Sequence, residues 1–313
     1  MSTSPGGHKC APVALLLFNR PEVTRKVLER VLAAKPESVY VIADGPRPGH
    51  PDDARLCQEV RDMVTRAPWD CPVHTELAET NMGLKARVSS GLDWVFSHEE
   101  FAIVLEDDCV ADQSFFPFAT ELLEKYVDDE RVGIVSGNNF LRGKQLNDDS
   151  YFFAPDVRIW GWATWKRVWQ DFSREGLSRQ WSESEGDGLL ARLSSKARRS
   201  QLKRMMAKAH LLNSWALPFV LHAQRRGYLS AVPRENLVTN IGFGADSTHT
   251  QFESFTAELP VGTLSFPLRH PEDVVESPEA GRIESTEEKK LWLTFPLRHP
   301  VDFLGRVFRY LRR

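Results

Sequence analysis

The first 140 residues of the chain alternate short apolar runs with stretches of helical periodicity. A strand buried on both faces reads as a short, continuous apolar run, whereas an amphipathic helix repeats apolar residues every three or four positions. Strands that alternate with helices form a mostly parallel sheet with helices on both faces, which predicts a Rossmann-like α/β fold. The expected strands are 12–18, 38–43, 73–78, 101–105 and 132–136, and the expected helices are 21–34, 52–65, 83–96 and 115–126.

Three acidic residues, Glu106, Asp107 and Asp108, directly follow the fourth apolar run. Ligands of open α/β sheets bind just outside the carboxyl ends of the strands. Crowded carboxylates repel one another unless a positive group joins them, and Mg²⁺ or Mn²⁺ takes oxygen ligands that it often shares with phosphate. The tripeptide therefore indicates a metal–phosphate site. The alternative is that these acids only face water, with Asp112 alone capping the helix that follows.

Composition is ordinary for a soluble globular protein and argues against nucleic acid as a partner. The 313 residues carry a net charge of −3 and are 42% hydrophobic, so no overall positive field attracts polyanions. The first nine residues lack the order of a signal peptide, and the nearby apolar run 13–18 is too short to span a bilayer. The four cysteines show no CxxC pairing, which is typical of reduced thiols in a cytoplasmic protein.

Tryptophans gather at one place in the second half of the chain. Trp160, Trp162, Trp165 and Trp169 fall within ten residues. Such rings either pack in an aromatic core or present flat faces to a sugar ring. No clear linker separates this region from the first half, so we expect it to complete the same domain. Residues 191–212 are expected to form a basic helix with a solvated face.

The C-terminal region contains an internal repeat and a basic end. The segment 264–271, which contains FPLRHP, recurs at 293–300. Its prolines argue against a helix, so two extended segments on similar grooves are expected. Residues 302–313 alternate apolar and arginine positions with helical spacing, which is typical of a helix on an anionic membrane surface. The alternative is a terminal helix that packs on the protein itself or on a partner.

Six short motifs occur in a set order along the chain. They are LFNRP at 17–21, IADGPR at 42–47, NMGLK at 81–85, VLEDD at 104–108, IWGWATW at 159–165 and NIGFG at 240–244. In order and spacing the region 12–250 resembles bacterial GT-A glycosyltransferases. The resemblance is to family 2-like enzymes of surface-polysaccharide clusters and to the related N-acetylglucosaminyltransferase I.

This resemblance implies a GT-A domain and its ligands. The domain would span residues 1–250, with a nucleotide-binding half at 12–140 and an acceptor half at 141–250, followed by a C-terminal extension at 251–313. The implied cofactor is Mn²⁺ or Mg²⁺, the donor is a nucleotide-sugar, and the acceptor is a glycan or glycolipid. The implied role is polysaccharide biosynthesis. Apart from the resemblance, the cysteines indicate the cytoplasm, and the basic pattern of 302–313 indicates a peripheral contact at the inner face of the membrane.

The resemblance also assigns the donor residues. Asp108 would ligate the metal that bridges the donor diphosphate, with Glu106 and Asp107 as supports. Arg20 and Asp44 would line the base and phosphate pocket, because an arginine contacts phosphate in a bidentate manner and an aspartate accepts from a pyrimidine imide. The remaining donor candidates are Arg47, Lys85 and His249.

The acceptor side is assigned in the same way. The segment Trp160, Gly161 and Trp162 would line the sugar and acceptor cleft, where a glycine lets the backbone approach a ligand closely. Asn138, at the end of the fifth expected strand, and Trp215 would add contacts there.

The catalytic base is where the chain departs from the family pattern. An inverting transferase needs a base for the acceptor proton, and related sequences carry an aspartate where this chain has Asn213 before Trp215. Asp156 and Asp246 are the candidate replacements. A non-catalytic module that binds nucleotide-sugar or glycan is one alternative. A sugar nucleotidyltransferase is another, although FNRP at 18–21 replaces the glycine-rich loop that such enzymes carry after the first strand.

Overall fold

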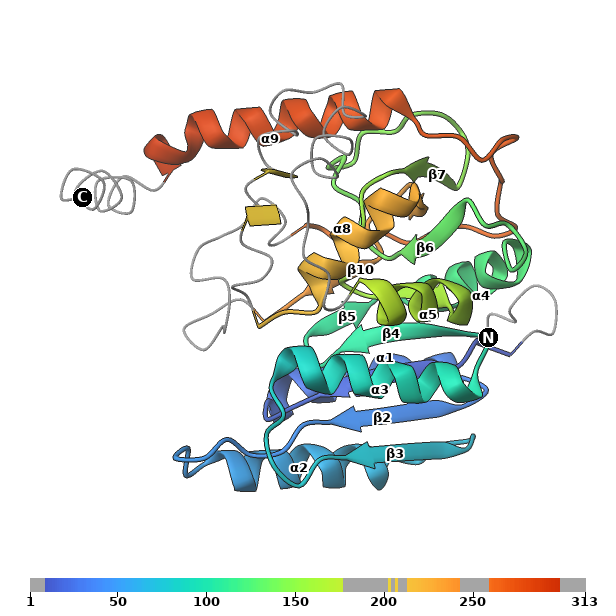
Figure 1. The fold of residues 1–313 in the computed structure, drawn as a ribbon. Helices are drawn as coiled ribbons and strands as arrows, with labels where there is room; N and C mark the ends of the chain where they lie inside the picture. The colour runs from blue at the N-terminus through green and yellow to red at the C-terminus, as the bar shows by residue number, and fades with distance from the viewer. Residues whose placement is uncertain (1–8, 177–201, 204–205, 208–212, 243–258, 299–313) are drawn as a thin grey trace.

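The computed structural model describes residues 9–176, 202–203, 206–207, 213–242 and 259–298. Within these residues, one large mixed sheet has the strand order β3-β2-β1-β4-β8-β6-β9-β7 (Figure 1). The strands are β1 Val13–Leu17, β2 Val39–Ala43, β3 Val73–Leu77, β4 Phe101–Glu106, β6 Val132–Ser136, β7 Tyr151–Ala154, β8 Trp162–Trp165 and β9 Leu229–Pro233.

Most of this sheet is parallel. β3, β2, β1 and β4 pair in parallel, and so do β6 and β9. β8 lies antiparallel between β4 and β6, and β7 lies antiparallel at the far edge beside β9. β4 and β6 therefore run in the same direction, and the carboxyl ends of the six parallel strands meet on one side of the sheet.

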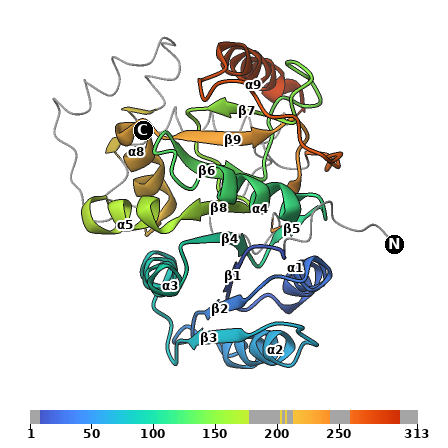
Figure 2. The same cartoon turned by 90° about the vertical axis from the view of Figure 1, so that its right-hand side faces the viewer.

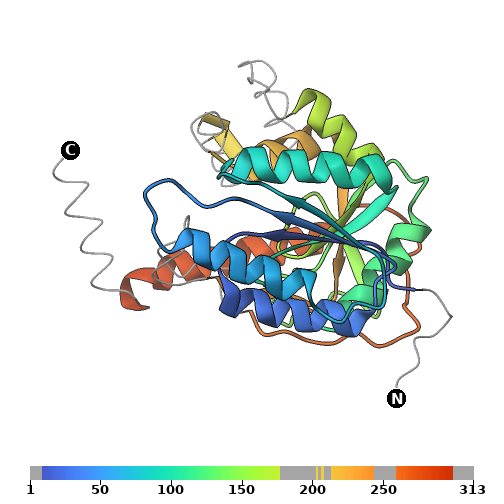
Figure 3. The ribbon, with the colours of Figure 1, turned by 90° about the horizontal axis from the view of Figure 1, so that it is seen from below.

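Helices cover both faces of the sheet. α1 Pro21–Ala34, α2 Asp53–Thr65 and α4 Phe115–Lys125 lie on one face (Figure 2). α3 Leu84–His98, α5 Lys166–Glu175 and α8 Ala216–Arg226 lie on the other. The view from below shows the sheet sandwiched between these two layers (Figure 3). The expected α/β architecture is thereby confirmed.

A short ribbon follows the acidic tripeptide. β5 Cys109–Ala111 pairs antiparallel with β10 Val238–Asn240, so that Asn240 lies opposite Cys109. This pairing returns a distant part of the chain to the end of β4. The backbone N–H of Ile241 donates to the carbonyl oxygen of Asp108 at 2.9 Å and closes the ribbon beside the tripeptide.

The core is continuous through the sheet and is rich in aromatic rings. The central strands β1, β2 and β6 are buried along their whole length, as expected for strands covered on both faces. Trp162, Trp165 and Trp169 are each no more than 1% exposed, and the Trp162 ring stacks on Trp215 with centroids 5.7 Å apart. Most of the tryptophan cluster therefore stabilises the interior.

The second copy of the C-terminal repeat differs from the expectation. The first copy runs from Leu264 to Pro271 outside helix and strand, and it buries Leu264 and Leu268 in the core. The second copy is helical up to Arg298, because it continues α9 Pro278–Arg298. The expectation of two extended segments is therefore wrong for the second copy: the helix begins upstream and propagates through Pro296.

α9 is anchored to the sheet's far end by its N-terminal half. Glu284 pairs with the buried Arg158, and Glu287 pairs with Lys144 at 2.7 Å. Ala280 packs among apolar residues of β7 and β9. The expected segment 302–313 and most of the expected helix 191–212 lie outside the described residues. Among the helices that the structure describes, none is both long and apolar enough to cross a membrane.

Candidate active site at the carboxyl end of the sheet

Strand register brings Arg20 next to the acidic tripeptide. β1 pairs in parallel with β4, with Leu16 opposite Glu106. The chain that leaves β1 therefore passes beside the chain that leaves β4. Arg20 occupies the position just before α1, whose first residue is Pro21. Its side chain crosses to the tripeptide, 87 residues away in sequence.

One guanidinium holds two carboxylates of the tripeptide. Nη2 of Arg20 pairs with Oδ1 of Asp107 and lies 2.9 Å from Oδ2 of Asp108, and Nε donates to Oδ2 of Asp107 at 3.2 Å. The side chains of Asp107 and Asp108 are 5% and 9% exposed, whereas that of Arg20 is 34% exposed. A buried pair of acids thus shares one cation, which reaches solvent.

Asn240 holds Asp108 from the opposite side. Its Nδ2 donates to Oδ1 of Asp108 at 2.9 Å, and its own Oδ1 accepts from the N–H of Gly242 at 2.8 Å. A Cβ on Gly242 would lie 2.0 Å from Oδ2 of Asp108, so a side chain there would displace that oxygen. We therefore add Asn240 and Gly242 to the site. The NIGFG motif was the sequence signal, but the side-chain contact depends on the β5–β10 pairing.

The tripeptide has unusual acidity. Desolvation, together with the charges of Asp108 and Asp107, raises the pKa of Glu106 to about 8. Desolvation also raises the pKa of Asp107, to about 6, although Arg20 acts in the opposite direction. Negative charge is therefore costly at this place, and an added cation would be stabilised there.

The donor chemistry of the site fits a divalent cation that is shared with phosphate. Among the described residues, no group of three or more His, Cys, Asp and Glu side chains is arranged to hold a metal by itself. Sites of the shared type need only one or two carboxylates, because phosphate and water complete the shell. Asp108 supplies such a carboxylate, and its Oδ2 is engaged by Arg20 in this structure.

Asp44 is held by neutral donors from its own neighbourhood. Oδ1 accepts from the N–H groups of Gly45 and Met82, both at 2.8 Å. Oδ2 accepts from Nδ2 of Asn81 at 3.0 Å and from the N–H of Gly83 at 3.1 Å. Asp44 thus ties the end of β2 to the chain that enters α3. A nucleobase would compete with these four bonds for its oxygens.

Arg47 is also engaged at the same edge. Its Nε and Nη2 donate to the two oxygens of Asp53 at 2.6 and 3.0 Å, and its guanidinium lies 5.2 Å from the centre of the Phe18 ring. Asn19 donates to the same carboxylate at 2.7 Å. This network links the loops after β1 and β2. Lys85 lies partly exposed in the first turn of α3.

Asn213 lies beside the residue that precedes α3, although it is far from that helix in sequence. Nδ2 of this exposed residue would be 3.0 Å from a Cβ built on Gly83. Gly83 has φ +81°, so a side chain there would also strain the backbone. The position where the family pattern expects a base therefore faces the same edge of the sheet as Asp44.

The acceptor candidates are largely buried. Trp162 and Trp215 are 0% and 1% exposed, and each has a structural role in the aromatic core. Gly161 has φ +62°, and its close neighbour is Val238, 2.7 Å from the Cβ that it lacks. Asn138 is buried and donates to the carbonyl of Val238 at 3.0 Å. Trp160 is the partly exposed member of the segment, with its ring centre 6.5 Å from that of Phe140.

Of the candidate bases, the structure describes only Asp156. It lies partly exposed just after β7. Asp246 and the donor candidate His249 lie outside the described residues.

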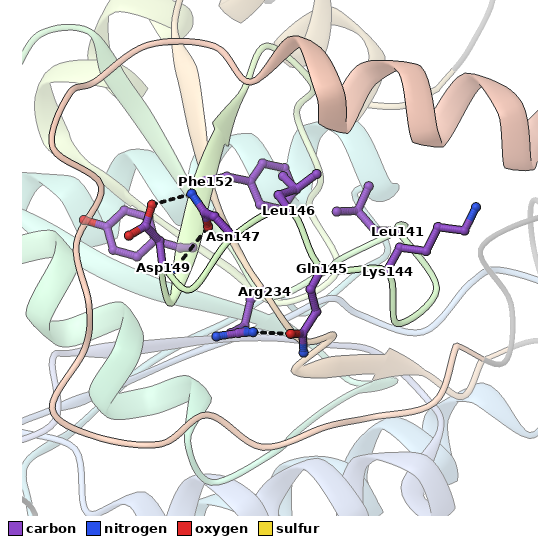
Figure 4. Close-up of a pocket in the computed structure, with 9 residues that line it drawn as sticks. Leu141, Lys144, Gln145, Leu146, Asn147, Asp149, Phe152 and Arg234 are labelled. Atoms are coloured by element: carbon purple, nitrogen blue, oxygen red, sulfur yellow. Dashed lines mark hydrogen bonds between the residues drawn. The ribbon is translucent and has the colours of Figure 1, made fainter.

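A hollow occurs elsewhere, on the loop that follows β6 (Figure 4). Its wall includes Leu141, Lys144, Phe152 and Arg234, and Arg234 donates to Gln145 within it. Neither Arg20, Asp44 nor the tripeptide lines this hollow.

Comparisons with known proteins give a likeness of fold. No protein-family model matches the chain, and no curated protein sequence does. The chain is similar to the mannosyltransferase PcManGT from Pyrobaculum calidifontis in complex with GDP-Man and Mn²⁺, with 14% identity over 69% of this chain and 74% of that chain and a TM-score of 0.35. UDP-glucose pyrophosphorylase complexed with UDP-glucose gives 8% identity over 72% and 93% and a TM-score of 0.37.

A third similar structure is 4-diphosphocytidyl-2C-methyl-D-erythritol synthase from Anaerococcus prevotii DSM 20548, with 10% identity over 63% of this chain and 85% of that chain and a TM-score of 0.35. At these identities the likeness concerns the α/β fold alone. An argument about function therefore has to come from the residues of the site.

Proposed function

We propose that this protein is a metal-dependent inverting glycosyltransferase of the GT-A type. It would transfer a sugar from a nucleotide-sugar donor to a glycan or glycoconjugate acceptor during surface-polysaccharide biosynthesis. The observation that supports this most is the pairing of Arg20 with Asp107 and Asp108 at the carboxyl ends of β1 and β4, because it combines a phosphate-binding cation with a metal-binding carboxylate.

The proposed reaction exchanges one bond at the sugar. The bond from the anomeric carbon to the donor diphosphate breaks, and a bond from that carbon to an acceptor hydroxyl oxygen forms. When bound, a divalent cation supplies Lewis-acid stabilisation of the leaving nucleoside diphosphate. Arg20 binds the diphosphate through its fork of N–H groups, and Asn240 keeps Asp108 oriented.

The acceptor proton passes to a general base in this scheme. We propose Asp156 or Asp246 for that role, because Asn213 has no carboxylate to accept the proton. Trp160 is our proposed contact for the acceptor or the sugar, since it is the partly exposed tryptophan of its segment. Lys85 and Arg47 are proposed as further phosphate contacts, and Asp44 as a base contact.

Two alternatives have support in particular residues. Asn213 favours a binding module that holds a nucleotide-sugar without turnover. A nucleotidyltransferase would share the sheet and the acidic metal ligands. The loop FNRP at 18–21 counts against it, because Phe18 and Asn19 are fixed by Arg47 and Asp53 and offer no glycine-rich phosphate cradle.

Donor binding and turnover with Mn²⁺ test this proposal. The protein is mixed with UDP-, GDP- and dTDP-sugars with and without Mn²⁺, and thermal unfolding and the released nucleotide are measured. At least one donor should raise Tm only when Mn²⁺ is present, and that donor should release nucleoside diphosphate. Asp108→Ala should abolish both effects. Asp148→Ala, whose side chain is 91% exposed, serves as the matched control.

The products separate the three candidate functions. A transferase yields nucleoside diphosphate. A nucleotidyltransferase yields nucleoside triphosphate when pyrophosphate is added. A binding module gives the Tm shift without either product on any acceptor tested. The metal-dependent proposal fails if no donor gives a Mn²⁺-dependent response.

Membrane contact through residues 302–313 is a separate proposal, motivated by the spacing of apolar and arginine positions there. It would place the enzyme at the inner face of the membrane, beside a lipid-linked acceptor. Flotation with anionic vesicles tests it: deletion of 302–313 should release the protein, and unchanged flotation would refute the contact.

A further inference from the structure

We propose that Arg20 is a displaceable counter-ion that makes metal and donor diphosphate bind together. In the resting protein Arg20 blocks the divalent cation from Asp108, and the diphosphate removes that block by drawing Arg20 to itself. This inference rests on the proposed function, because it needs a diphosphate ligand.

The first step in the argument is that both oxygens of Asp108 already have partners. Its Oδ1 accepts from Asn240 at 2.9 Å, and its Oδ2 lies 2.9 Å from Nη2 of Arg20. Gly242 also lies close, because a Cβ built on it would be 2.0 Å from Oδ2 and 2.8 Å from Nη1 of Arg20. A cation that approaches Oδ2 therefore competes with the guanidinium for that oxygen.

The second step is electrostatic. A divalent cation and a guanidinium that share one carboxylate oxygen repel each other, and desolvated surroundings strengthen the repulsion because little water screens it. Asp107 and Asp108 are almost fully buried, so this condition holds here. Metal binding without a diphosphate is therefore opposed for as long as Arg20 stays in place.

The third step is that Arg20 is able to leave. About a third of its side chain is exposed, and it is held by side-chain carboxylates rather than by the backbone. A diphosphate offers it the same planar, bidentate geometry that Asp107 offers. Asp107 also contacts Nε, so the guanidinium can leave Asp108 and still keep one protein partner.

The thermodynamic consequence is coupling between the two ligands. A diphosphate that removes Arg20 from Asp108 raises the affinity for the metal, and the metal must raise the affinity for the diphosphate by the same factor. Arg20 therefore occupies Asp108 without donor, and Asp108 becomes a metal ligand when donor is present.

The test is a titration of the full-length protein with Mn²⁺ alone, with bound and free Mn²⁺ distinguished by electron paramagnetic resonance. Arg20→Gln should bind Mn²⁺ at least tenfold more tightly than the parent protein. Repeating the titration with UDP, GDP or dTDP should show that the nucleotide tightens Mn²⁺ binding in the parent protein and does so much less in Arg20→Gln. Arg66→Gln is the control, because that side chain, just after α2, is 77% exposed.

A second variant guards against misfolding. Arg20→Lys keeps a positive charge but does not bridge two carboxylates, so its affinity for Mn²⁺ should lie between those of the parent protein and Arg20→Gln. Unchanged or weaker Mn²⁺ binding by Arg20→Gln and Arg20→Lys, both folded by circular dichroism, would overturn the inference. If the parent protein still binds Mn²⁺ with a nucleotide in that case, the proposed function stands without it. If neither protein binds Mn²⁺ under any condition, both fail.

Discussion

Asp44 follows β2 and Asp108 follows β4 at the same edge of the sheet, and each residue is 6% exposed. Their partners differ. Asp44 accepts three bonds from backbone N–H groups and one from Asn81, all within the loops after β2 and β3. Asp108 is held by the side chains of Arg20 and Asn240, from distant parts of the chain. Burial alone therefore does not distinguish a carboxylate held by fixed backbone donors from one held by side chains that can move.

The difference lies in what the donors can do. Backbone N–H groups of an ordered loop cannot turn away, so a carboxylate that accepts from them is held as a fixed acceptor. Side-chain donors can rotate to another ligand at modest cost. The same sequence signal, an aspartate after a buried strand, thus supports stability at β2 and is suited to ligand exchange at β4.

Removal of each carboxylate in turn should give the largest difference in the free energy of unfolding. Asp44→Ala leaves the N–H groups of Gly45, Met82 and Gly83 without their acceptor, so the free energy of unfolding should fall by roughly 2–4 kcal/mol. Asp108→Ala leaves Arg20 paired with Asp107 and relieves repulsion between two acids, so its loss should stay below about 1 kcal/mol. Urea denaturation followed by circular dichroism measures both.

Similar losses for these two variants would break the comparison. The slope m of the urea denaturation curve serves as the internal control, because a change in m would signal an altered denatured state rather than the loss of hydrogen bonds. Mn²⁺ titration provides a second measurement. We expect Asp108→Ala to lose Mn²⁺ binding and Asp44→Ala to keep it.

A glycine beside each carboxylate allows a second contrast. A Cβ on Gly45 would lie 2.4 Å from the backbone carbon of Thr80, which cannot move without shifting the loop, so Gly45→Ala should cost about 1–3 kcal/mol. A Cβ on Gly242 would meet the ends of the Asp108 and Arg20 side chains, which can rotate. Gly242→Ala should therefore cost less than about 1 kcal/mol while weakening Mn²⁺ binding.

Thermal unfolding and Mn²⁺ titration of the two alanine variants decide this contrast. If Gly242→Ala is the less stable protein, or if it binds Mn²⁺ like the parent, then Asp108 is held as rigidly as Asp44.

Periodicity was sufficient to predict the parallel half of the fold. The expected helix 21–34 and the expected strand 132–136 have the bounds of α1 and β6. The sequence did not indicate that Trp162–Trp165 forms the strand β8. That segment is only four residues long and fully buried, and its two antiparallel neighbours, β4 and β6, end far from it in sequence. Local pattern does not reveal an antiparallel insertion of that kind.

The C-terminal repeat also shows that local sequence does not determine the local structure. Two segments with the same FPLRHP core take different structures, because 264–271 packs Leu264 and Leu268 into the core whereas 293–298 extends a helix that began at Pro278. The same local sequence is therefore compatible with both an irregular segment and the continuation of a helix.

The candidate site was predictable in its residue types but not in its pairings. Clustered acids after a strand indicated a cationic partner, and Arg20 belongs to the LFNRP motif at 17–21. The bond between them depends on the register of β1 with β4, and the role of Asn240 depends on the β5–β10 ribbon. Neither register is encoded within a window of a few residues.

Asp53 should give the smallest effect of these predictions. It accepts hydrogen bonds both from a backbone N–H group and from side chains. It accepts from the side chain and the backbone N–H of Arg47 and from Asn19. The Arg47 hydrogen bond holds the pKa of Asp53 well below its usual range, although burial acts in the opposite direction. A carboxyl group whose pKa is lowered on folding contributes stability above its unfolded pKa, near 4, and loses it as pH falls toward the folded pKa.

Asp53→Asn should therefore lower the free energy of unfolding by about 1–2 kcal/mol at pH 7, a figure set by the hydrogen bonds because Arg47 is 39% exposed and its charge is screened. The difference from the parent protein should shrink between about pH 4 and pH 2. Asp52→Asn is the matched control: its side chain is 78% exposed and 3.7 Å from Arg55, so it should change stability by less than about 0.5 kcal/mol at either pH. A constant difference between Asp53→Asn and the parent across this range would show that the carboxylate charge contributes nothing, and that Asp53, like Asp44, acts as a fixed acceptor.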